Sequence, residues 1–553
     1  MMEKSIIKTL VLGTFVALGL ASCTETWDDH YNEKEELNSS ETLWDVIQSQ
    51  SELSDFAKML QRTGYDELLK QDRFYTVWAP VNGFAYSEDN DSLVQAEFVE
   101  NHIADYRHIA TGTLEENKVK MINKKYIYFD GAAGEYTFKG NALNKKNIPA
   151  KNGILHTISG YANFTANVWE QLGKIDSLSE INSFLKSFDE IEFDLNNSVQ
   201  GPIVNGQITY LDSVVKERND WFSKIGYLNR EDSSYVMIAP TNEAWRTIYN
   251  KALTYYTFAN NNPKGDSLQV LLAKSAICNN LVYSKTINHM KQDTDIRDLD
   301  SLISNYRQHR RIFYEEQMEQ IFEGYKEKYE LSNGDLIVVD KYGFDPRKCW
   351  HDTIKIEGEN SMYIEGATCN FEYGSISKDS IEKYKLISRG SWGKYAPTTT
   401  TGNPKLTIKL PKVLSAPYLI KCVFVPANYA DKSVTDLKPN KFTAQLKYVD
   451  LNGKSQTLSL GSKLTNDPTR IDTMTLVPNA KDITTEYFRF PVNEVEENNL
   501  ELINAQLIIT SALTSRDKDF DRTIRLDCVM LVPIDEETYV PEGGGNDNEG
   551  DKE

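Results

Sequence analysis

Two short apolar runs, rich in β-branched and aromatic residues, stop at the same pattern, Ala-Pro-x-Asn. They occupy residues 75–82 and 235–242. Each run predicts a buried strand that ends at its proline, because proline cannot donate a backbone hydrogen bond to a sheet. The asparagine that follows is a residue type that caps helices, so we expect it to cap a helix that begins there. A strand-stop-helix unit that occurs twice predicts two copies of one domain.

The repeat continues on both sides of these strands. Upstream, a constant offset of 125 residues aligns Trp44 with Trp169 and Leu60 with Leu185 without a gap. Apolar residues at helical spacing predict that each copy opens with helices, and the first copy has a further predicted helix around 95–106. Each copy then closes on an Asn-Gly turn followed by an apolar strand. The mixture predicts a compact α+β domain.

This set of motifs resembles the fasciclin-type domain. That family has a T-V-F-A-P-T-N-like strand, an N-H-like helix and a closing N-G-x-x-H-x-I-like strand. The first copy matches all three, with His102 in the helix and His156 in the closing strand, although Trp78 and Val81 depart from the pattern. The resemblance implies an adhesion or interaction module rather than an enzyme. It also implies that His102 and His156 are hydrogen-bonding residues of the core.

The second copy is less regular and longer. It keeps Ala-Pro-Thr-Asn but has Asn280 in place of the family's histidine. From the proline to the closing glycine there are 73 residues in the first copy and 94 in the second. We expect one insertion within 302–329, where opposite charges three to five residues apart favour an exposed helix over a basic ligand patch. A second insertion is expected near 194–232.

Beyond residue 340 the helical spacing disappears and strand-like runs follow one another. Apolar residues alternate along 442–448 and 524–532, and Asp-Leu-Asn-Gly at 450–453 predicts a hairpin turn. Roughly eight to ten strands in about 190 residues predict an all-β sandwich, jelly-roll-like. The predicted strands are 353–357, 406–410, 418–425, 442–449, 474–477, 487–492, 500–510 and 523–532.

The N-terminus has the features of a bacterial lipoprotein signal. Lys4 and Lys8 precede a short apolar run, and Leu-Ala-Ser-Cys then resembles a lipobox that ends at Cys23. This implies a lipidated Cys23, with an ordinary secretory signal as the alternative. Acidic residues just after the cysteine resemble the surface-export signal of Bacteroidota lipoproteins. We expect a protein anchored by its lipid to the outer membrane and facing the cell exterior.

The predicted organisation is an α+β chain with two fasciclin-like domains and a C-terminal sandwich. Its net charge of −20 argues against nucleic acid and anionic lipid as partners. Limited proteolysis should cut near the boundaries. The predicted parts are a signal peptide (1–22), a tether (23–41), fasciclin-like domains (42–165 and 166–340), a β-sandwich (341–536) and a disordered tail (537–553).

Chemical motifs are few. No zinc-ligand spacing, H-E-x-x-H motif, EF-hand loop or P-loop occurs, so we expect no catalytic residue, metal or cofactor. Carboxylates are numerous, and a glycosidase pair among them stays open. With Cys23 lipidated, five cysteines remain, of which Cys349 and Cys369 are candidates for a disulfide in an oxidising compartment.

The candidate ligand site is a short aromatic segment with an arginine. Arg389, Trp392 and Tyr395 precede four consecutive threonines, a composition that suits sugar stacking and hydrogen bonding. The alternative is that Trp392 is a core residue. The leading hypothesis is a non-catalytic surface protein, an accessory of a nutrient uptake complex that handles glycans. The alternatives are an adhesin for host or neighbouring cells and a surface polysaccharide hydrolase with unrecognised carboxylates.

Overall fold

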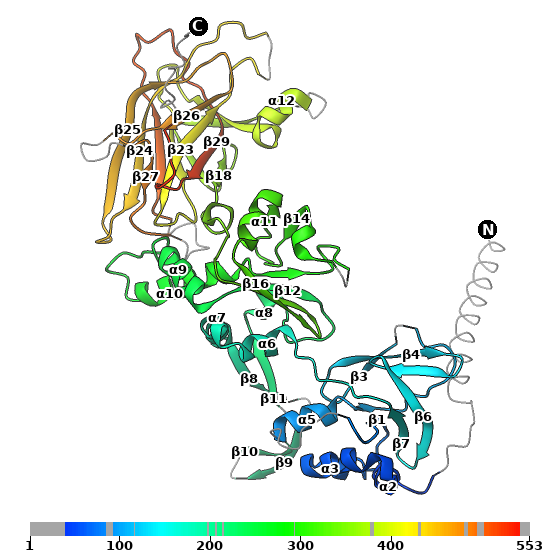
Figure 1. Ribbon diagram of the computed structural model, residues 1–553. Helices are drawn as coiled ribbons and strands as arrows, with labels where there is room; N and C mark the ends of the chain where they lie inside the picture. The colour runs from blue at the N-terminus through cyan, green and yellow to red at the C-terminus, as the bar shows by residue number, and fades with distance from the viewer. Residues whose placement is uncertain are drawn as a thin grey trace, which may run out of the picture. The chain divides into compact units, whose positions relative to one another are not determined.

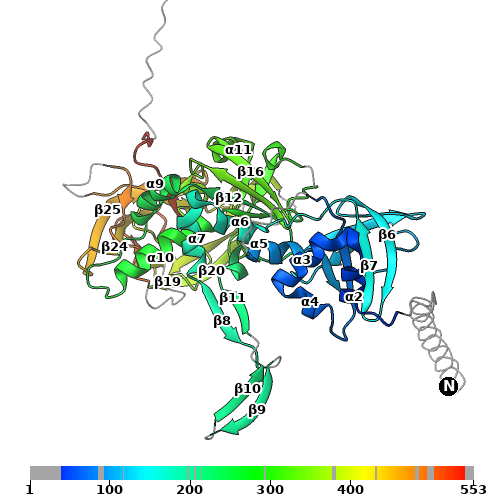
Figure 2. The ribbon, with the colours of Figure 1, turned by 60° about the horizontal axis from the view of Figure 1, so that its bottom comes forward.

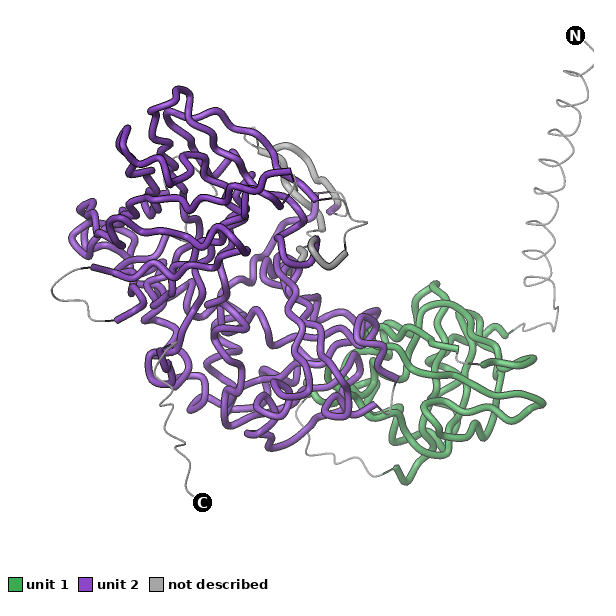
Figure 3. The backbone as a smooth tube through the Cα atoms, turned by 90° about the horizontal axis from the view of Figure 1, so that it is seen from above, with its two compact units in different colours: residues 1–167 green, residues 168–553 purple. Residues whose placement is uncertain are grey.

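The chain divides into two compact units, residues 1–167 and 168–553 (Figure 3). Residues 1–38 and 542–553 lie outside the described residues, and so do the predictions for the signal peptide, Cys23, most of the tether and most of the tail. The predicted domain boundaries stay a prediction. The computed structural model describes residues 39–84, 92–115, 117–195, 198–204, 207–212, 215–291, 294–376, 381–429, 433–479, 485–494 and 503–541.

Unit 1 is built around strand β1 (Tyr75–Pro80), the first Ala-Pro run. It pairs in parallel with β7 (Gly153–Ile158) and antiparallel with β2 (Ile103–Asp105). Every residue of β1 and β7 is buried, as expected for central strands. Beyond β7 the sheet continues through β6 (Asn141–Ala150), β5 (Glu135–Phe138), β4 (Tyr126–Ala132) and β3 (Lys118–Lys120) (blue to cyan in Figure 1).

The two faces of this sheet bury different cores. Tyr75, Val77 and Ala79 pack with the apolar residues of the helices, whereas Trp78 lies in an aromatic cluster on the other face. The Trp78 ring stacks on Phe138 with ring centroids 4.4 Å apart. The helices are α2 (Leu43–Ser49), α3 (Ser54–Thr63), α4 (Tyr65–Leu68) and α5 (Ser92–Glu100).

The sequence placed the end of α5 too late. The helix ends at Glu100, not near 106, because residues 103–105 pair with the edge of β1 as strand β2. Three residues of an edge strand give no period that could separate them from a helix. The closing strand predicted after the first Asn-Gly turn is confirmed as β7.

The repeat predicted from the sequence recurs in unit 2 with the same register. Strand β12 (Tyr235–Pro240) pairs in parallel with β17 (Gly334–Val339) and antiparallel with β13 (Val282–Ser284). Tyr235 lies opposite Gly334, as Tyr75 lies opposite Gly153 in unit 1. The accompanying elements are α6 (Val168–Lys174), α7 (Ser179–Lys186), α8 (Phe222–Ile225), α9 (Asn242–Leu253), α10 (Gly265–Cys278) and β16 (Tyr325–Leu331).

The predicted exposed helix over 302–329 is wrong in extent. The segment contains a hairpin of β14 (Ser301–Ile303) and β15 (Ile312–Tyr314), then α11 (Glu315–Phe322), then β16. Strand β16 pairs with β17 as β6 pairs with β7, so it belongs to the repeat and is not inserted. Arg311, one of the basic residues weighed as a ligand patch, has its Nη1 2.5 Å from an Asp352 carboxylate oxygen.

The other insertion is an antiparallel ribbon. One ladder joins β8 (Asp189–Phe193) to β11 (Val215–Asn219), and a second joins β9 (Val199–Val204) to β10 (Gln207–Asp212). Figure 2 shows the two ladders end to end, leading away from α6 and α7.

Two antiparallel sheets follow residue 350 (yellow-green to red in Figure 1). Apolar side chains of both, such as Phe424 and Phe442, belong to one buried cluster that also includes the second repeat. The first sheet has the order β20 (Cys369–Ser375), β21 (Ser391–Pro397), β29 (Ile524–Pro533), β23 (Pro417–Phe424), β26 (Asp472–Leu476), with β18 (Ile354–Glu357) on β29 and β27 (Phe488–Arg489) on β23. The second has the order β19 (Ile364–Ala367), β22 (Lys405–Lys409), β28 (Gln506–Ser511), β24 (Lys441–Val449), β25 (Ser455–Thr465).

Most strands of these sheets were predicted closely, but β19, β20, β21 and β25 were missed. Strands β20 and β21 contain glycine or proline, which read as loop residues in a sequence. The hairpin turn at 450–453 is confirmed, since the N–H of Gly453 bonds the Asp450 carbonyl at 2.9 Å between β24 and β25.

Candidate functional site

The predicted stacking pair does not lie on the surface. Trp392 and Tyr395 are 3% and 2% exposed on β21. They are three residues apart, so they point to opposite faces of the sheet. Trp392 packs with Ile387 and Val425, and Tyr395 belongs to the main core of unit 2 and donates a hydrogen bond to the Gly358 carbonyl at 2.8 Å. An exposed sugar platform made of these two residues is therefore wrong.

Arg389 does not join either of them. Its side chain is exposed, and its Nε lies 3.4 Å from a carboxylate oxygen of Glu357. Its backbone has a φ of 54°, in the left-handed region, just before β21 begins. The three predicted ligand residues thus point to three different environments.

The two histidines implied by the family resemblance are confirmed as core residues. The N–H of Ala162 donates to His102 Nε2 at 2.9 Å, and His102 Nδ1 donates to the Phe98 carbonyl at 2.7 Å. Asn147 N–H donates to His156 Nδ1 at 3.2 Å, and His156 Nε2 donates to a carbonyl. Burial lowers the pKa of each imidazole to about 4, so both stay neutral and neither suits acid-base chemistry at neutral pH.

The repeated asparagines cap a different helix from the one predicted. Asn82 accepts a hydrogen bond from the N–H of Asp55 at 3.1 Å, in the first turn of the earlier helix α3. Asn242 does the same for Glu180 in α7 at 3.0 Å, while Thr241 caps the following helix α9. A cap can be recognised from sequence, but its partner across the fold cannot.

A cleft of about 290 Å³ lies where the second repeat meets the C-terminal sheets, within unit 2. Its described lining residues come from the loop between α9 and α10, from the end of β24 and the turn after it, and from positions 492–494 and 504. Its volume is at the small end of ligand pockets, which span about 300–1,000 Å³. Its polar lining residues are Asn261, Asn262, Asn493, Glu494 and Asn504.

Backbone hydrogen bonds hold the cleft walls together. The carbonyl of Thr257 accepts from the backbone N–H of Asn493 at 2.8 Å and from its side-chain amide at 2.9 Å. The N–H of Asn260 bonds the carbonyl of Leu451 at 2.8 Å. One Glu494 carboxylate oxygen accepts the backbone N–H groups of residues 504 and 505, both at 3.0 Å. These bonds join the segments that form the walls of the cleft.

The lining suits an uncharged polar ligand. Side-chain amides both donate and accept hydrogen bonds, as a sugar hydroxyl does. Phe258, Val449 and Val492 provide apolar surface beside them. Among the described residues, no Lys or Arg lines the cleft, so it has no cation to hold a carboxylate or phosphate. Sequence patterns did not single out Asn261 and Asn262, because the lining residues outside their own loop lie about 190 to 240 residues further along the chain.

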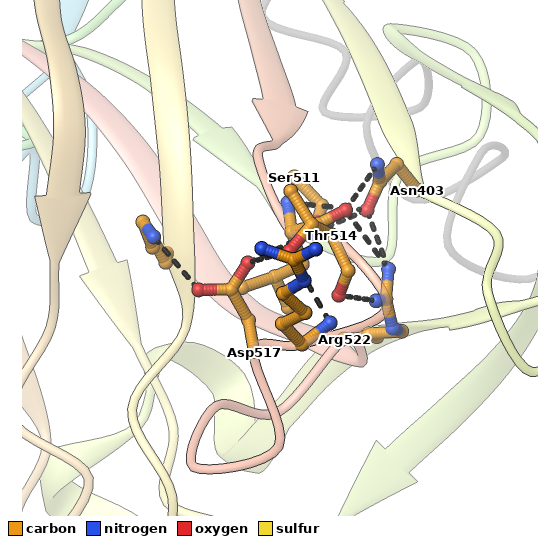
Figure 4. Close-up of polar contacts among 8 residues, drawn as sticks. Asn403, Ser511, Thr514, Asp517 and Arg522 are labelled. Carbon is orange, nitrogen blue, oxygen red and sulfur yellow. Dashed lines mark hydrogen bonds and ion pairs between the residues drawn. The ribbon is translucent and has the colours of Figure 1, made fainter.

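A second set of hydrogen-bonded polar residues joins the loop after β28 to neighbouring segments (Figure 4). Arg522 donates to the Asn403 side-chain oxygen at 2.8 Å and to the Thr514 carbonyl at 2.6 Å. Asp517 accepts from the N–H of Thr514 at 2.7 Å and from Lys441 at 3.0 Å, and these bonds hold its pKa below the usual range. The groups of this network bond one another, which indicates a loop-stabilising role.

A third set of interacting polar residues surrounds the buried carboxyl of Asp527. Its two oxygens lie 3.0 and 3.2 Å from the backbone nitrogen of Ser388, which donates to it. The Ser388 hydroxyl donates to Glu357 at 2.9 Å. Burial, with a smaller contribution from Glu357 and Glu359, raises the pKa of Asp527 to about 7. Across the residues that can be described, no set of three or more His, Cys, Asp or Glu is placed to hold a metal ion.

Asp527→Asn is expected to stabilise the protein at pH 8 and to have little effect at pH 4. The unfolded carboxyl ionises near 3.8 and the folded one near 7, so folding loses stability as pH rises between these values. At about 1.4 kcal/mol per unit, and with some solvent screening, the expected gain at pH 8 is about 2–4 kcal/mol. Denaturant unfolding of wild type and variant at both pH values measures it. An equal difference at both would contradict the prediction.

The five cysteines among the described residues are free thiols. Cys349 is buried and Cys369 is half-buried, and neither is bonded to a partner, so the candidate disulfide between them is not formed. Cys422 and Cys528 are buried within β23 and β29, and burial raises the pKa of both thiols. Both therefore behave as small core residues.

Comparison with protein families identifies part of the chain. The fasciclin domain model matches residues 51–161, the region of β1, β7 and the two core histidines. A search of the curated proteins gave no match. In the residues whose structure is described, no helix is both long and apolar enough to cross a membrane.

Several solved structures show distant likeness. A FAS1 domain pair from the insect cell adhesion molecule fasciclin I is 14% identical, covering 54% of this chain and 98% of its own, with a TM-score of 0.20. A Paenibacillus xanthan lyase is 10% identical over 37% of this chain and 16% of its own, with a TM-score of 0.20. A family 32 carbohydrate-binding module of Streptococcus pneumoniae EndoD is 12% identical over 31% and 96%, with a TM-score of 0.16. Scores this low carry no argument about fold or function.

Proposed function

We propose that this chain, whose residues 51–161 form a fasciclin domain, is a non-catalytic cell-surface protein that binds neutral polysaccharide. A fasciclin domain indicates a cell-surface or adhesion-type protein. The finer proposal is an accessory of a nutrient uptake system, in which the C-terminal sheets form a jelly-roll-like sandwich that presents the ligand site. The repeats would then contact other surface proteins.

The amide-lined cleft carries this proposal. Asn261, Asn262 and Asn504 offer donors and acceptors beside the ring of Phe258, and no Lys or Arg is among the described lining residues. Neutral sugars present hydroxyl groups in every direction and apolar C–H faces, and this lining matches both. A neutral ligand also agrees with a chain of net charge −20, which would repel acidic polymers.

Anchoring is the part of the proposal that rests on sequence. The segment that ends at Cys23 resembles a lipobox, so the protein would be held to the outer membrane by lipid and face outward. In whole cells, wild type should fractionate with the outer membrane and be cut by added protease. A Cys23→Ala variant should be released from membranes.

Binding of neutral polysaccharides to the purified protein tests the cleft. Replacing both Asn261 and Asn504 with alanine should weaken binding about 10-fold or more, because each lost amide leaves sugar hydroxyls without a partner. Both side chains are exposed, so the fold should be kept. Asn260→Ala is the matched control, since this exposed asparagine adjoins the lining and holds the wall only through its backbone. Equal binding by all three proteins would refute the cleft as the ligand site.

Two alternatives have distinct readouts. An adhesin would promote aggregation of cells or attachment to host surfaces without affinity for purified polysaccharide. The fasciclin domain is the observation that supports this alternative. A hydrolase would need paired carboxylates, for which Asp527 and Glu357 are one candidate pair. Both are already bonded to Ser388. Turnover of any polysaccharide that is lost in Glu357→Gln would replace the non-catalytic proposal.

A further inference from the structure

An aromatic pair lies exposed at the edge of the first C-terminal sheet. Phe371 and Tyr373 are 37% and 69% exposed on the edge strand β20. They are two residues apart, so both side chains stand on the same face of the sheet. Their ring centroids are 4.8 Å apart in a T-shaped arrangement.

Residues of the neighbouring strand β21 hold this aromatic pair in place. Phe371 lies opposite Tyr395 on β21, and the two ring centroids are 5.2 Å apart. Tyr395 is buried and its hydroxyl bonds the carbonyl of Gly358, so it gives Phe371 a fixed support. Tyr373 lies opposite Gly393, which has no side chain to cover its ring. The ring of Phe371 therefore packs on the buried Tyr395, whereas the ring of Tyr373 is largely exposed to solvent.

The size and charge of this surface indicate what binds there. Two aromatic side chains with these exposures offer on the order of 200 Å². A stable protein interface needs about 800 Å² from each partner, so the pair alone is too small for one. Lys394 and Glu372 form an ion pair at 2.6 Å between β21 and this edge strand, and charged side chains on an edge discourage the addition of a partner strand. A small apolar surface remains, and the ring of Tyr373, which is 69% exposed, is large enough to stack on one face of a sugar ring.

We propose that Phe371 and Tyr373 form a stacking surface for a sugar ring of the polysaccharide that also enters the cleft. This inference rests on the proposed function and adds a second contact to it. Two linked contacts on one polymer raise its apparent affinity, because the second contact forms at a high effective concentration. A short oligosaccharide, which occupies one contact at a time, gains nothing from the second.

The test compares a neutral polysaccharide with its own di- or trisaccharide, using the full-length protein. Phe371→Ala with Tyr373→Ala should weaken polysaccharide binding about 10-fold or more, and leave binding of the short oligosaccharide in the cleft within about twofold. Tyr373→Phe keeps the ring and should retain wild-type affinity. Tyr314→Ala, which removes another exposed tyrosine of unit 2, is the matched control and should bind as wild type does.

The outcomes separate this inference from the proposed function. If wild type binds no polysaccharide, the proposed function fails and the stacking surface falls with it. If wild type binds the polymer and the cleft variant loses it, but the double aromatic variant binds unchanged, only the stacking surface is refuted. Should the double variant fail to fold, Tyr373→Ala alone repeats the test, because this side chain is the more exposed of the two. Unchanged polymer binding by Tyr373→Ala would then refute the surface.

Discussion

Asn333→Ala is expected to lower the free energy of unfolding of unit 2 by about 3–6 kcal/mol. This asparagine is 1% exposed and comes directly before the closing strand β17. Its side-chain oxygen accepts the N–H of Val168 at 2.9 Å, and its amide donates to the carbonyls of Leu228 and Arg230 at 2.8 Å each. Alanine leaves three backbone groups without partners, and each buried group left unpaired costs about 1–3 kcal/mol.

The same bonds recur in unit 1 and supply a second copy of the experiment. Asn152 accepts from Leu43 N–H at 2.7 Å and donates to the carbonyls of Leu69 and Gln71 at 2.8 Å. Asn152→Ala should therefore destabilise unit 1 by a similar amount. Hydrogen exchange measured on the full-length chain reports each unit through its own central strand, β1 or β12. Asn260→Ala, at an exposed site, should leave both strands as protected as in wild type. Loss of less than about 1 kcal/mol in both units would contradict this account.

Much of the repeat could be predicted because its signals are local. The strands that end in Ala-Pro are buried throughout and mostly apolar, and proline fixes where each one stops. The Asn-Gly pairs also marked the closing strands correctly. The sequence does not indicate which distant residue a side chain will bond in the fold. Asn82 was expected to cap the helix after it, yet it caps α3, which precedes it in the chain.

The ligand site predicted at Trp392 and Tyr395 is wrong because these residues lie in a strand and not in a loop. Residues 391–397 read as a loop because they contain glycine and proline, whereas they form strand β21. In a loop, Trp392 and Tyr395 could face one way. In a strand, an odd separation places them on opposite faces, and each enters a core. The exposed aromatics are Phe371 and Tyr373, whose even separation would have indicated a shared face had β20 been recognised.

The cleft could not be predicted from the sequence. Its lining residues come from segments separated by about two hundred residues, and no periodicity connects Asn261 with Asn504. Asparagines in a loop are ordinary turn residues unless the fold brings their amides together. Sites of this kind depend on how the second repeat packs against the C-terminal sheets, which is decided by a core that draws on both.

Gly334→Ala is expected to destabilise unit 2 by about 3–5 kcal/mol. Strand β12 runs so close to this glycine that an added Cβ would lie 1.8 Å from the carbonyl oxygen of Tyr235, and the glycine has a φ of +144°. An alanine must push the central strand away and adopt a backbone conformation that L-residues avoid, so overpacking and strain add together. Gly153 has the same position in unit 1, where a Cβ would lie 2.0 Å from the Tyr75 carbonyl oxygen.

The set of strands that Gly334→Ala destabilises is as informative as the loss in free energy of unfolding. Buried residues of the second repeat and of both C-terminal sheets belong to one apolar cluster, so Gly334→Ala should raise hydrogen exchange in β23 and β29 as well as in β12. Gly153→Ala should loosen unit 1 alone, since its cores are separate. Gly173→Ala in helix α6 is the control, because an added Cβ there meets nothing closer than 3.7 Å. If Gly334→Ala loosens residues 168–340 while β23 and β29 keep their protection, the second repeat and the C-terminal sheets unfold independently. That result would favour three folding units, divided near residue 340 as the sequence predicts, over one cooperative unit from residue 168 onward.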